Sequence, residues 1–184
     1  MNFDVRVGER IYKDLKIPLL GEHQTRNAAL AIALCQEERS DLEEEKLRRS
    51  LASLEWPGRM QILSSEPFVM LDACINEAST ENIRQTLDFL SIGDITLIVG
   101  IPEDKDYRGV VKGMAGYASE VVLTMSQNPH YRFSPSQLQQ LDVNGVWKEN
   151  VGEAISYGVS RGRPVVILGT TSVVSEVLSM DRWL

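Results

Sequence analysis

The chain contains 184 residues, of which 43% are hydrophobic and 24% are charged, which is typical of a globular protein that buries a core without disulfides or metals. Its net charge of −7, with no run of lysines or arginines, argues against the electropositive surface of a nucleic-acid-binding protein. No apolar run approaches the roughly 18 residues that span a bilayer, and residues 1–4 lack the features of a signal peptide. We therefore expect a cytoplasmic protein with neither nucleic-acid nor membrane partners.

The first elements that the sequence predicts are a hairpin and a helix. Residues 2–7 and 10–15 alternate weakly between apolar and polar side chains on either side of a Gly-Glu pair, which indicates a β-hairpin. Residues 24–37 repeat apolar side chains at helical spacing. Cys35 lies in this apolar stretch, so we expect it to be a small buried hydrophobe.

A second helix and a domain boundary follow. Ser40 and Glu43 form a capping box, in which Ser40 accepts from the amide of Glu43 and the Glu43 side chain reaches back. This helix is expected to end near Leu54. The sequence W-P-G at residues 56–58 then breaks the helix and marks the predicted boundary between two domains.

Beyond this boundary, short apolar strands alternate with helices. Strands are predicted at residues 61–63, 68–71, 95–99, 121–124 and 165–168, and helices near residues 80–90, 109–118, 136–141, 151–161 and 173–180. Ser134 and Gln137 form a second capping box, with Pro135 at the first helical position. The alternation predicts an α/β fold, with a Rossmann-like, mostly parallel sheet that carries helices on both faces.

The sequence offers no metal-ligand cluster and no catalytic triad. Its two histidines, His23 and His130, are too poorly accompanied by other functional side chains for either kind of site, and Cys35 and Cys74 have no metal-ligand spacing. No G-x-G-x-x-G sequence is present, so nothing indicates a dinucleotide cofactor. We identify no catalytic residue and no metal ligand in this chain.

Four short motifs occur in a characteristic order. They read HQTRNAA at residues 23–29, WPGRMQ at residues 56–61, LDACIN at residues 71–76 and VGIPEDKDY at residues 99–107. This order resembles the end of the central domain and the whole C-terminal domain of folylpolyglutamate synthase/dihydrofolate synthase, in the Mur ligase superfamily. The resemblance implies that residues 1–56, a hairpin and two helices, are the tail of a central ATPase domain, and that residues 57–184 are the Mur ligase C-terminal domain.

The resemblance implies nucleotide-binding roles for Gln24, Asn27, Arg59 and Asp72. A side-chain amide can donate to and accept from an adenine or ribose in one plane, and a guanidinium can bind phosphate through two parallel bonds. The alternatives are that Gln24, Thr25 and Asn27 lie in an exposed first helical turn, and that Arg59 is a linker residue paired with a surface carboxylate. Asp72 ends a strand, where open α/β sheets place ligand groups.

The motif around Asp72 departs from the family pattern D-G-A-H-N-P. Residues 72–77 read D-A-C-I-N-E, so Asp72 and Asn76 match the pattern. The other four positions differ from it, and they are Ala73, Cys74, Ile75 and Glu77. Ile75 replaces a histidine and can neither donate a hydrogen bond nor carry charge. This departure indicates altered nucleotide handling, a different substrate or a decayed site.

The resemblance also places the incoming amino acid. Lys105 is the expected partner of its carboxylate, and the neighbouring Asp104 is a less specific candidate. Thr171 and Ser172 follow the last predicted strand and open a helix, where backbone amides favour an anion. The alternative for these two residues is a plain helix cap.

These motifs imply an ATP-dependent ligase that adds an amino acid, expected to be glutamate, to a folate, with ATP and Mg²⁺ as cofactors. The chain lacks the G-x-x-x-x-G-K-[ST] loop that holds a triphosphate, so we expect this segment to be inactive alone and to be a fragment of the ligase. One alternative is a naturally truncated, non-catalytic binding module. Another is a ligase of a different Mur-type substrate, such as a peptidoglycan precursor or cyanophycin.

A last expectation concerns residues 1–56. If these residues are separated from the rest of the central domain, the apolar face of their hairpin lacks the sheet that would cover it. We therefore expect this segment to self-associate or to exchange between copies through the open strand edge.

Overall fold

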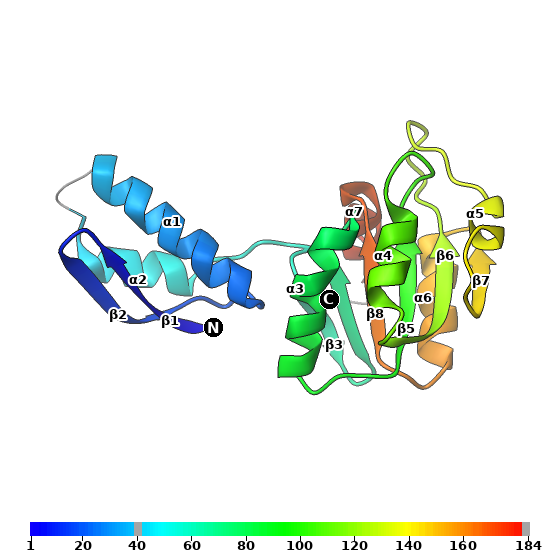
Figure 1. Cartoon of the computed structure of the whole chain (residues 1–184), viewed down its shortest axis with the longest axis horizontal. Coiled ribbons are helices and arrows are strands. Elements are labelled where there is room, and N and C mark those ends of the chain that lie inside the picture. The colour runs from blue at the N-terminus through cyan, green and yellow to red at the C-terminus, as the bar shows by residue number, and fades with distance from the viewer. Residues whose placement is uncertain (39–41, 182–184) are drawn as a thin grey trace. The chain divides into compact units, whose positions relative to one another are not determined.

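The computed structural model describes residues 1–38 and 42–181, which form two compact units, Met1–Pro57 and Gly58–Leu184. Figure 1 shows a hairpin with two helices in the first unit and a larger layered sheet in the second. Each unit has its own hydrophobic core. The candidate site residues are distributed over both units.

In the first unit, two helices cover a two-stranded hairpin. Strands β1 (Asn2–Val7) and β2 (Arg10–Lys16) pair antiparallel, and helices α1 (Glu22–Glu38) and α2 (Glu44–Ala52) follow. Their buried side chains form one small core, made of Tyr12, Leu15, Ile17, Ala28, Ile32, Leu47 and Leu51. The apolar face of the hairpin is therefore covered by the two helices, contrary to the expectation that it lacks a partner.

Two further expectations for this unit are corrected. The second helix begins at Glu44, and Glu43 stands in the N-cap position without a side-chain capping bond, because its carboxylate pairs with Lys46 at 2.7 Å. The other member of the predicted capping box, Ser40, lies outside the described residues. Cys35 is exposed rather than buried, because only the opposite face of α1 packs on the core.

The second unit is built on a six-stranded sheet with the order β3-β4-β8-β5-β6-β7. Its strands are β3 (Gln61–Ser65), β4 (Phe68–Asp72), β5 (Ile95–Gly100), β6 (Ala118–Thr124), β7 (Gly145–Lys148) and β8 (Val165–Gly169). Strand β3 is antiparallel to β4, and all other neighbours are parallel. All residues of β5 and β8 are buried, as expected for the centre of a parallel sheet covered on both faces.

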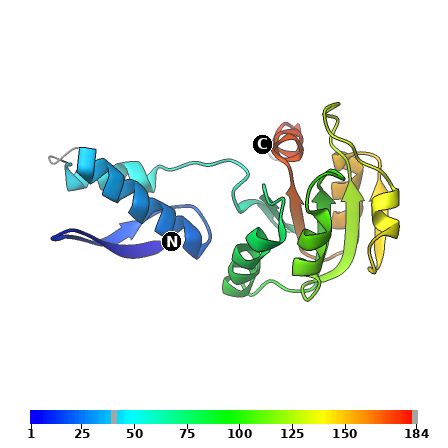
Figure 2. The same ribbon diagram turned by 45° about the horizontal axis from the view of Figure 1, so that its top comes forward.

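Five helices accompany this sheet. They are α3 (Glu77–Phe89), α4 (Tyr107–Met114), α5 (Ser136–Gln139), α6 (Val151–Ser160) and α7 (Thr171–Leu178). Helices α3 and α4 pack together on one face, and α6 and α7 pack together on the other, as Figures 1 and 2 show in green and in orange to red. The predicted Rossmann-like α/β fold is confirmed.

Some local details of this unit differ from the prediction. Strand β7 was not predicted, because it is a four-residue, half-buried edge strand with a weak apolar signal. The predicted capping box at α5 forms in part: Gln137 Oε1 accepts from the Ser134 amide at 3.1 Å, but Ser134 Oγ accepts from the Ser136 amide. Pro135 is the N-cap rather than the first helical residue.

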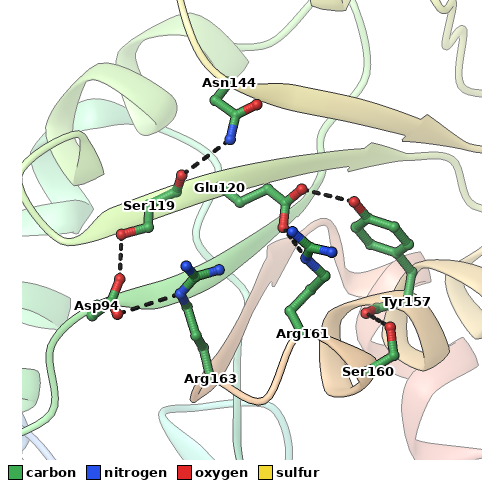
Figure 3. Close-up of polar contacts among 8 residues, drawn as sticks. All are labelled: Asp94, Ser119, Glu120, Asn144, Tyr157, Ser160, Arg161 and Arg163. Carbon is green, nitrogen blue, oxygen red and sulfur yellow. Dashed lines mark hydrogen bonds and ion pairs between the residues drawn. The ribbon is translucent and has the colours of Figure 1, made fainter.

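A polar network lies where the central strands begin, shown in Figure 3. The nearly buried carboxylate of Glu120, near the start of β6, accepts from the Tyr157 hydroxyl at 2.7 Å and from Arg161 Nε at 2.8 Å. Nearby, Asp94 accepts from the Ser119 hydroxyl and from Arg163 Nε. These bonds anchor the end of α6 and the segment before β8 to the amino edge of the sheet, away from the loops that follow the strands.

Candidate functional site

The candidate residues of the second unit lie at the carboxyl edge of its sheet. Asp72 ends β4, Asp104 and Lys105 follow β5, and Thr171 and Ser172 open α7 after β8. The carboxyl ends of parallel strands meet at one edge of a sheet, where open α/β folds place their ligands. The fold therefore brings these five residues to one edge.

Two glycines let the central strands of this edge approach closely. Gly100 and Gly169 are paired at the ends of β5 and β8, and a Cβ atom added to Gly169 would lie 2.9 Å from the Gly100 carbonyl oxygen. That carbonyl also accepts from the Thr170 amide at 3.3 Å. The start of α7 is thereby fixed against the end of β5.

The turn at residues 58–61 is fixed to the end of β4. Asp72 Oδ2 accepts from the Met60 amide at 2.9 Å, and the Gly58 carbonyl accepts from the Ala73 amide at 3.0 Å. Gly58 and Met60 both adopt positive φ, at 72° and 43°. The exposed Arg59 is thus presented from a tight turn, and it forms no ion pair within the described residues, so the alternative of a surface salt bridge is not seen.

Burial changes the acidity of Asp72. The side chain is almost enclosed, which raises its pKa from an ordinary value of 3.8 to about 6, although the Met60 amide and the positive charge of Arg59 act in the opposite direction. A carboxylate in this state can exchange a proton near neutral pH. Its bond to the Met60 amide could not be predicted from the sequence, because the partner is a backbone group in a turn.

The residues after Asp72 supply no further reactive group. Burial, with the nearby charges of Asp72 and Asp106, raises the pKa of the Cys74 thiol to about 12, so this thiol is neutral and not a nucleophile. Ile75 is half-buried. The structure therefore shows no side chain at these two positions that could replace the family's histidine.

Asp106 is a structural residue that joins two helices. Its Oδ1 accepts from the Gly109 amide at 3.0 Å in α4, and its Oδ2 accepts from the Glu77 amide at 2.9 Å in α3. A carboxylate at helix N-termini is favoured by their unpaired amides and their dipoles. The exposed Asp106 thus holds the amino-terminal ends of α3 and α4 together with its carboxylate.

The N-cap of α7 lies one residue before the positions that the sequence suggested. Thr170 is the N-cap, with its hydroxyl 3.5 Å from the Val173 amide, so the alternative of a cap by Thr171 or Ser172 is wrong. Ser172 Oγ instead accepts from Asn128 Nδ2 at 2.8 Å, which ties the loop after β6 to α7. Thr171 is exposed.

A polar pocket of about 390 Å³ opens beside the start of α4. Of the candidate residues, only Lys105 lines it. The Tyr107 hydroxyl donates to Gln140 Oε1 at 2.9 Å and accepts from Arg108 Nε at 3.1 Å, and Arg108 also donates to Gln140. The pocket is lined by Glu103, Lys105, Asp106, Tyr107, Arg108, Ser136 and Gln140.

Gln24 and Asn27 belong to the first unit, in the opening turns of α1. Gln24 is buried, so the alternative that it lies in an exposed turn is wrong for this residue, whereas Asn27 is exposed. Gln24 Oε1 accepts from Asn27 Nδ2 at 3.1 Å. The two amides therefore form one hydrogen-bonded pair.

The described residues contain no group of three or more His, Cys, Asp or Glu side chains that could hold a metal ion. Within the same residues, no helix is long and apolar enough to cross a membrane.

The chain is similar to folate ligases along most of its length. It is 30% identical over 172 residues to a probable bifunctional folylpolyglutamate synthase/dihydropteroate synthase of Haloferax volcanii, covering 89% of this chain and 20% of that protein. It is 26% identical over 184 residues to the dihydrofolate synthase/folylpolyglutamate synthase of Bacillus subtilis, covering 95% of this chain and 43% of that protein. The chain thus spans less than half the length of these relatives. No family model matches it.

Solved structures of folylpolyglutamate synthases have the same fold as this chain. Mycobacterium tuberculosis folylpolyglutamate synthase complexed with ADP and AMPPCP superposes with a TM-score of 0.82 at 25% identity, covering 98% of this chain and 45% of that one. The Yersinia pestis bifunctional enzyme complexed with AMPPNP and Mn has the same fold, with a TM-score of 0.83 at 24% identity, covering 95% and 42%. The predicted resemblance to the C-terminal region of folylpolyglutamate synthase/dihydrofolate synthase is confirmed.

Proposed function

We propose that this chain is the C-terminal part of an ATP-dependent ligase that adds glutamate to a folate carboxylate. The observation that carries the proposal is that both units together, from the hairpin to α7, match enzymes of this name in sequence and in fold. In such a ligase ATP activates the carboxylate, and the amine of the amino acid then displaces the phosphate. Residues outside this chain would hold the triphosphate and its Mg²⁺, since the chain has no phosphate-binding loop.

The nucleotide roles rest on Arg59, Asp72 and the amide pair in α1. Arg59 is exposed and without an ion pair within the described residues, so its guanidinium is available for phosphate. Asp72 fixes the turn that presents Arg59. The Gln24–Asn27 pair holds one amide in a defined orientation, which suits recognition of an adenine or ribose.

The amino-acid roles fall to the loops after β5 and β8. Lys105 lines the polar pocket and would bind a carboxylate, with Asp104 next to it in the loop. The start of α7, at the exposed Thr171 and the half-buried Ser172, offers backbone amides to a second anion. These residues would contribute to catalysis by positioning the amino acid, because holding its amine in a fixed geometry lowers the entropic barrier to attack.

The proposal is tested with the native protein isolated from its cells. Incubation with ATP, a folate and L-glutamate should give a folate that is heavier by one glutamyl residue, measured by mass spectrometry. A panel of carboxylate substrates separates a folate ligase from a ligase of peptidoglycan precursors or of cyanophycin. Failure with every substrate would favour the non-catalytic binding module. A cytoplasmic location is part of the proposal.

We also propose that the chain associates with a second copy through its first unit. Leu30 and Leu34 lie one turn apart on α1 and are 63% and 60% exposed, on the side away from the core residues Ala28 and Ile32. Large apolar side chains that adjoin on a helix and face water favour burial against another surface. The face of α1 supports this proposal better than the covered face of the hairpin.

A further inference from the structure

We propose that Asn144, at the start of β7, is a site of spontaneous covalent modification that converts it to aspartate or isoaspartate. The backbone nitrogen of Gly145 attacks the side-chain carbonyl carbon of Asn144. A new N–C bond closes a five-membered imide, the bond to the side-chain nitrogen breaks, and that nitrogen leaves as ammonia with the proton of the Gly145 amide. Water then opens the imide at either carbonyl. No electrons are transferred, and the modification does not depend on the proposed function.

The first support is the residue that follows Asn144. The attacking nitrogen belongs to the next residue in the chain, so a side chain on that residue obstructs ring closure. Of the seven asparagines in the sequence, Asn144 alone is followed by glycine. The residues after the other six are Phe, Ala, Glu, Ile, Pro and Val. Glycine also gives the backbone the freedom that the closed ring requires.

The second support is that the fold requires this glycine. A Cβ atom added to Gly145 would lie 2.8 Å from a methyl carbon of Leu138 and 2.9 Å from the carbonyl oxygen of Val121. Leu138 belongs to α5, and Val121 lies opposite Gly145 in β6. A larger residue would push both neighbours away. The packing of β7 therefore keeps the reactive pair Asn144-Gly145 in the structure.

The third support is the direction of the attacking amide. In a parallel pair of strands, a residue bonds to the two neighbours of the residue directly opposite it. Val121 is opposite Gly145, and its amide accordingly donates to the carbonyl of Asn144 at 3.0 Å. The amide of Gly145 thus points away from β6. Because β7 is the last strand of the sheet, this amide faces the outer edge and is not used by the ladder.

The fourth support is the weak hold on the Asn144 side chain. Asn144 is exposed, and its nitrogen lies 3.5 Å from the Ser119 carbonyl oxygen, which is longer than an ordinary hydrogen bond (Figure 3). Asn150 is held much more firmly as the N-cap of α6. Its oxygen accepts from the Glu153 amide at 2.8 Å, and its nitrogen donates to the Glu153 carboxylate at 2.7 Å. The Asn144 side chain can therefore turn towards Gly145.

Ring closure also requires the start of β7 to open, because the bond between Val121 and Asn144 keeps the backbone extended. A four-residue, half-buried edge strand opens more readily than the buried strands at the centre of the sheet. Isoaspartate then adds one atom to the main chain between residues 144 and 145. The added atom moves the carbonyl that Val121 binds, so the modification weakens the pairing of β7 with β6.

The test is incubation of the 184-residue chain at 37 °C and pH 8, followed by digestion with trypsin and mass spectrometry. Peptide 133–148 contains Asn144 and no other asparagine. It should gain the mass difference between oxygen and NH and separate into two products of equal mass. Most of it should convert while the peptides with the other six asparagines stay intact. A sample digested before incubation corrects for conversion during digestion.

The rate should increase with pH, because the attacking nitrogen must lose its proton. No conversion of peptide 133–148, or earlier conversion at another asparagine, would overturn the proposal.

Variants test the structural consequence. Asn144→Gln keeps the amide but would have to close a larger ring, so it should remain unmodified. Asn2→Gln, at an exposed position in the first unit, is the matched control and should convert at residue 144 as the parent does. Urea denaturation should show a lower midpoint for the second unit in the incubated parent than in fresh protein, and no change for Asn144→Gln. An equal decrease in both would overturn the proposed weakening of β7.

Discussion

The carboxylate of Asp72 accepts a hydrogen bond from the backbone amide of Met60 at 2.9 Å, and this bond fixes the turn that carries Arg59 to the end of β4. The turn also includes Gly58, whose carbonyl is bound by the amide of Ala73. Asp72 therefore positions Arg59 in addition to any contact of its own with a ligand.

Asp72 should make the stability of the second unit depend on pH. Because burial raises its pKa from 3.8 to about 6, the folded state binds more protons than the unfolded state between these values, and stability falls as pH rises through this window. Asp72→Asn removes this loss and can still accept from the Met60 amide. At pH 7.5 the variant should be more stable than the parent by about 1–3 kcal/mol, with a smaller difference at pH 4.5.

Urea denaturation followed by circular dichroism at both pH values measures this effect. An equal difference at pH 4.5 and pH 7.5 would show that Asp72 does not titrate in this range.

Gly58 should be intolerant of a side chain. Its φ is 72°, and an added Cβ atom would overlap a γ-methyl group of Val174. Gly58→Ala should therefore cost about 2–4 kcal/mol, from backbone strain together with overpacking. Gly162→Ala is the matched control, because Gly162 has a φ of 70° but nothing within 4 Å of the added atom, so only the strain of about 1 kcal/mol applies. Thermal denaturation compares the two, and equal losses would exclude the clash.

Asp106 should matter more for stability than its neighbour Asp104. Asp106→Asn keeps one acceptor oxygen and turns an amide group towards the second backbone donor, so one of the two helix caps is lost at a cost of about 1–2 kcal/mol. Asp104→Asn is the control, because Asp104 is exposed and its side chain accepts no hydrogen bond in the described structure. Denaturant midpoints measure both variants. Equal midpoints would mean that the double cap contributes nothing.

The network in Figure 3 predicts a cost for neutralising Glu120. The Glu120 side chain is 5% exposed, whereas that of its partner Arg161 is 44% exposed, so solvent screens the pair in part. Glu120→Gln should destabilise the second unit by about 1–3 kcal/mol, whereas Asp94→Asn, at a 66% exposed side chain, should have a smaller effect because solvent screens its charge. A Glu120→Gln variant as stable as the parent in urea denaturation would contradict the anchoring role.

The exposed face of α1 predicts that the isolated chain self-associates. Sedimentation velocity should show a weight-average mass that rises with concentration. Replacing Leu30 and Leu34 together by Gln should abolish the rise, because both side chains are exposed and their loss leaves the core residues in place. A parent chain that stays monomeric at every concentration would contradict the proposal.

The sequence predicts the sheet well because its strands are continuous apolar runs. Residues 95–100 are an example, since every side chain there is buried on one face or the other. The position of Asp72 and Lys105 at the carboxyl edge of the sheet could be predicted, because both residues come at or after the ends of predicted parallel strands. The predicted burial of Cys35 was wrong, because apolar neighbours in the sequence do not show which face of a helix packs on the core of a small unit.

The roles of Asp106 and Arg108 could not be predicted in the same way. Asp106 binds an amide that lies 29 residues away in the chain, and Arg108 is oriented by Gln140, 32 residues away. Such contacts depend on how two loops meet, which the periodicity of a sequence does not encode. The same limit applies to the bond between Asp72 and Met60.

The most direct test of the central claim is the intact mass of the endogenous protein in its native cells. We expect a species well above 20.6 kDa, because this chain would be one part of a ligase whose triphosphate-binding residues lie elsewhere. A species of 20.6 kDa would contradict the claim, because the cell would then use these two units alone.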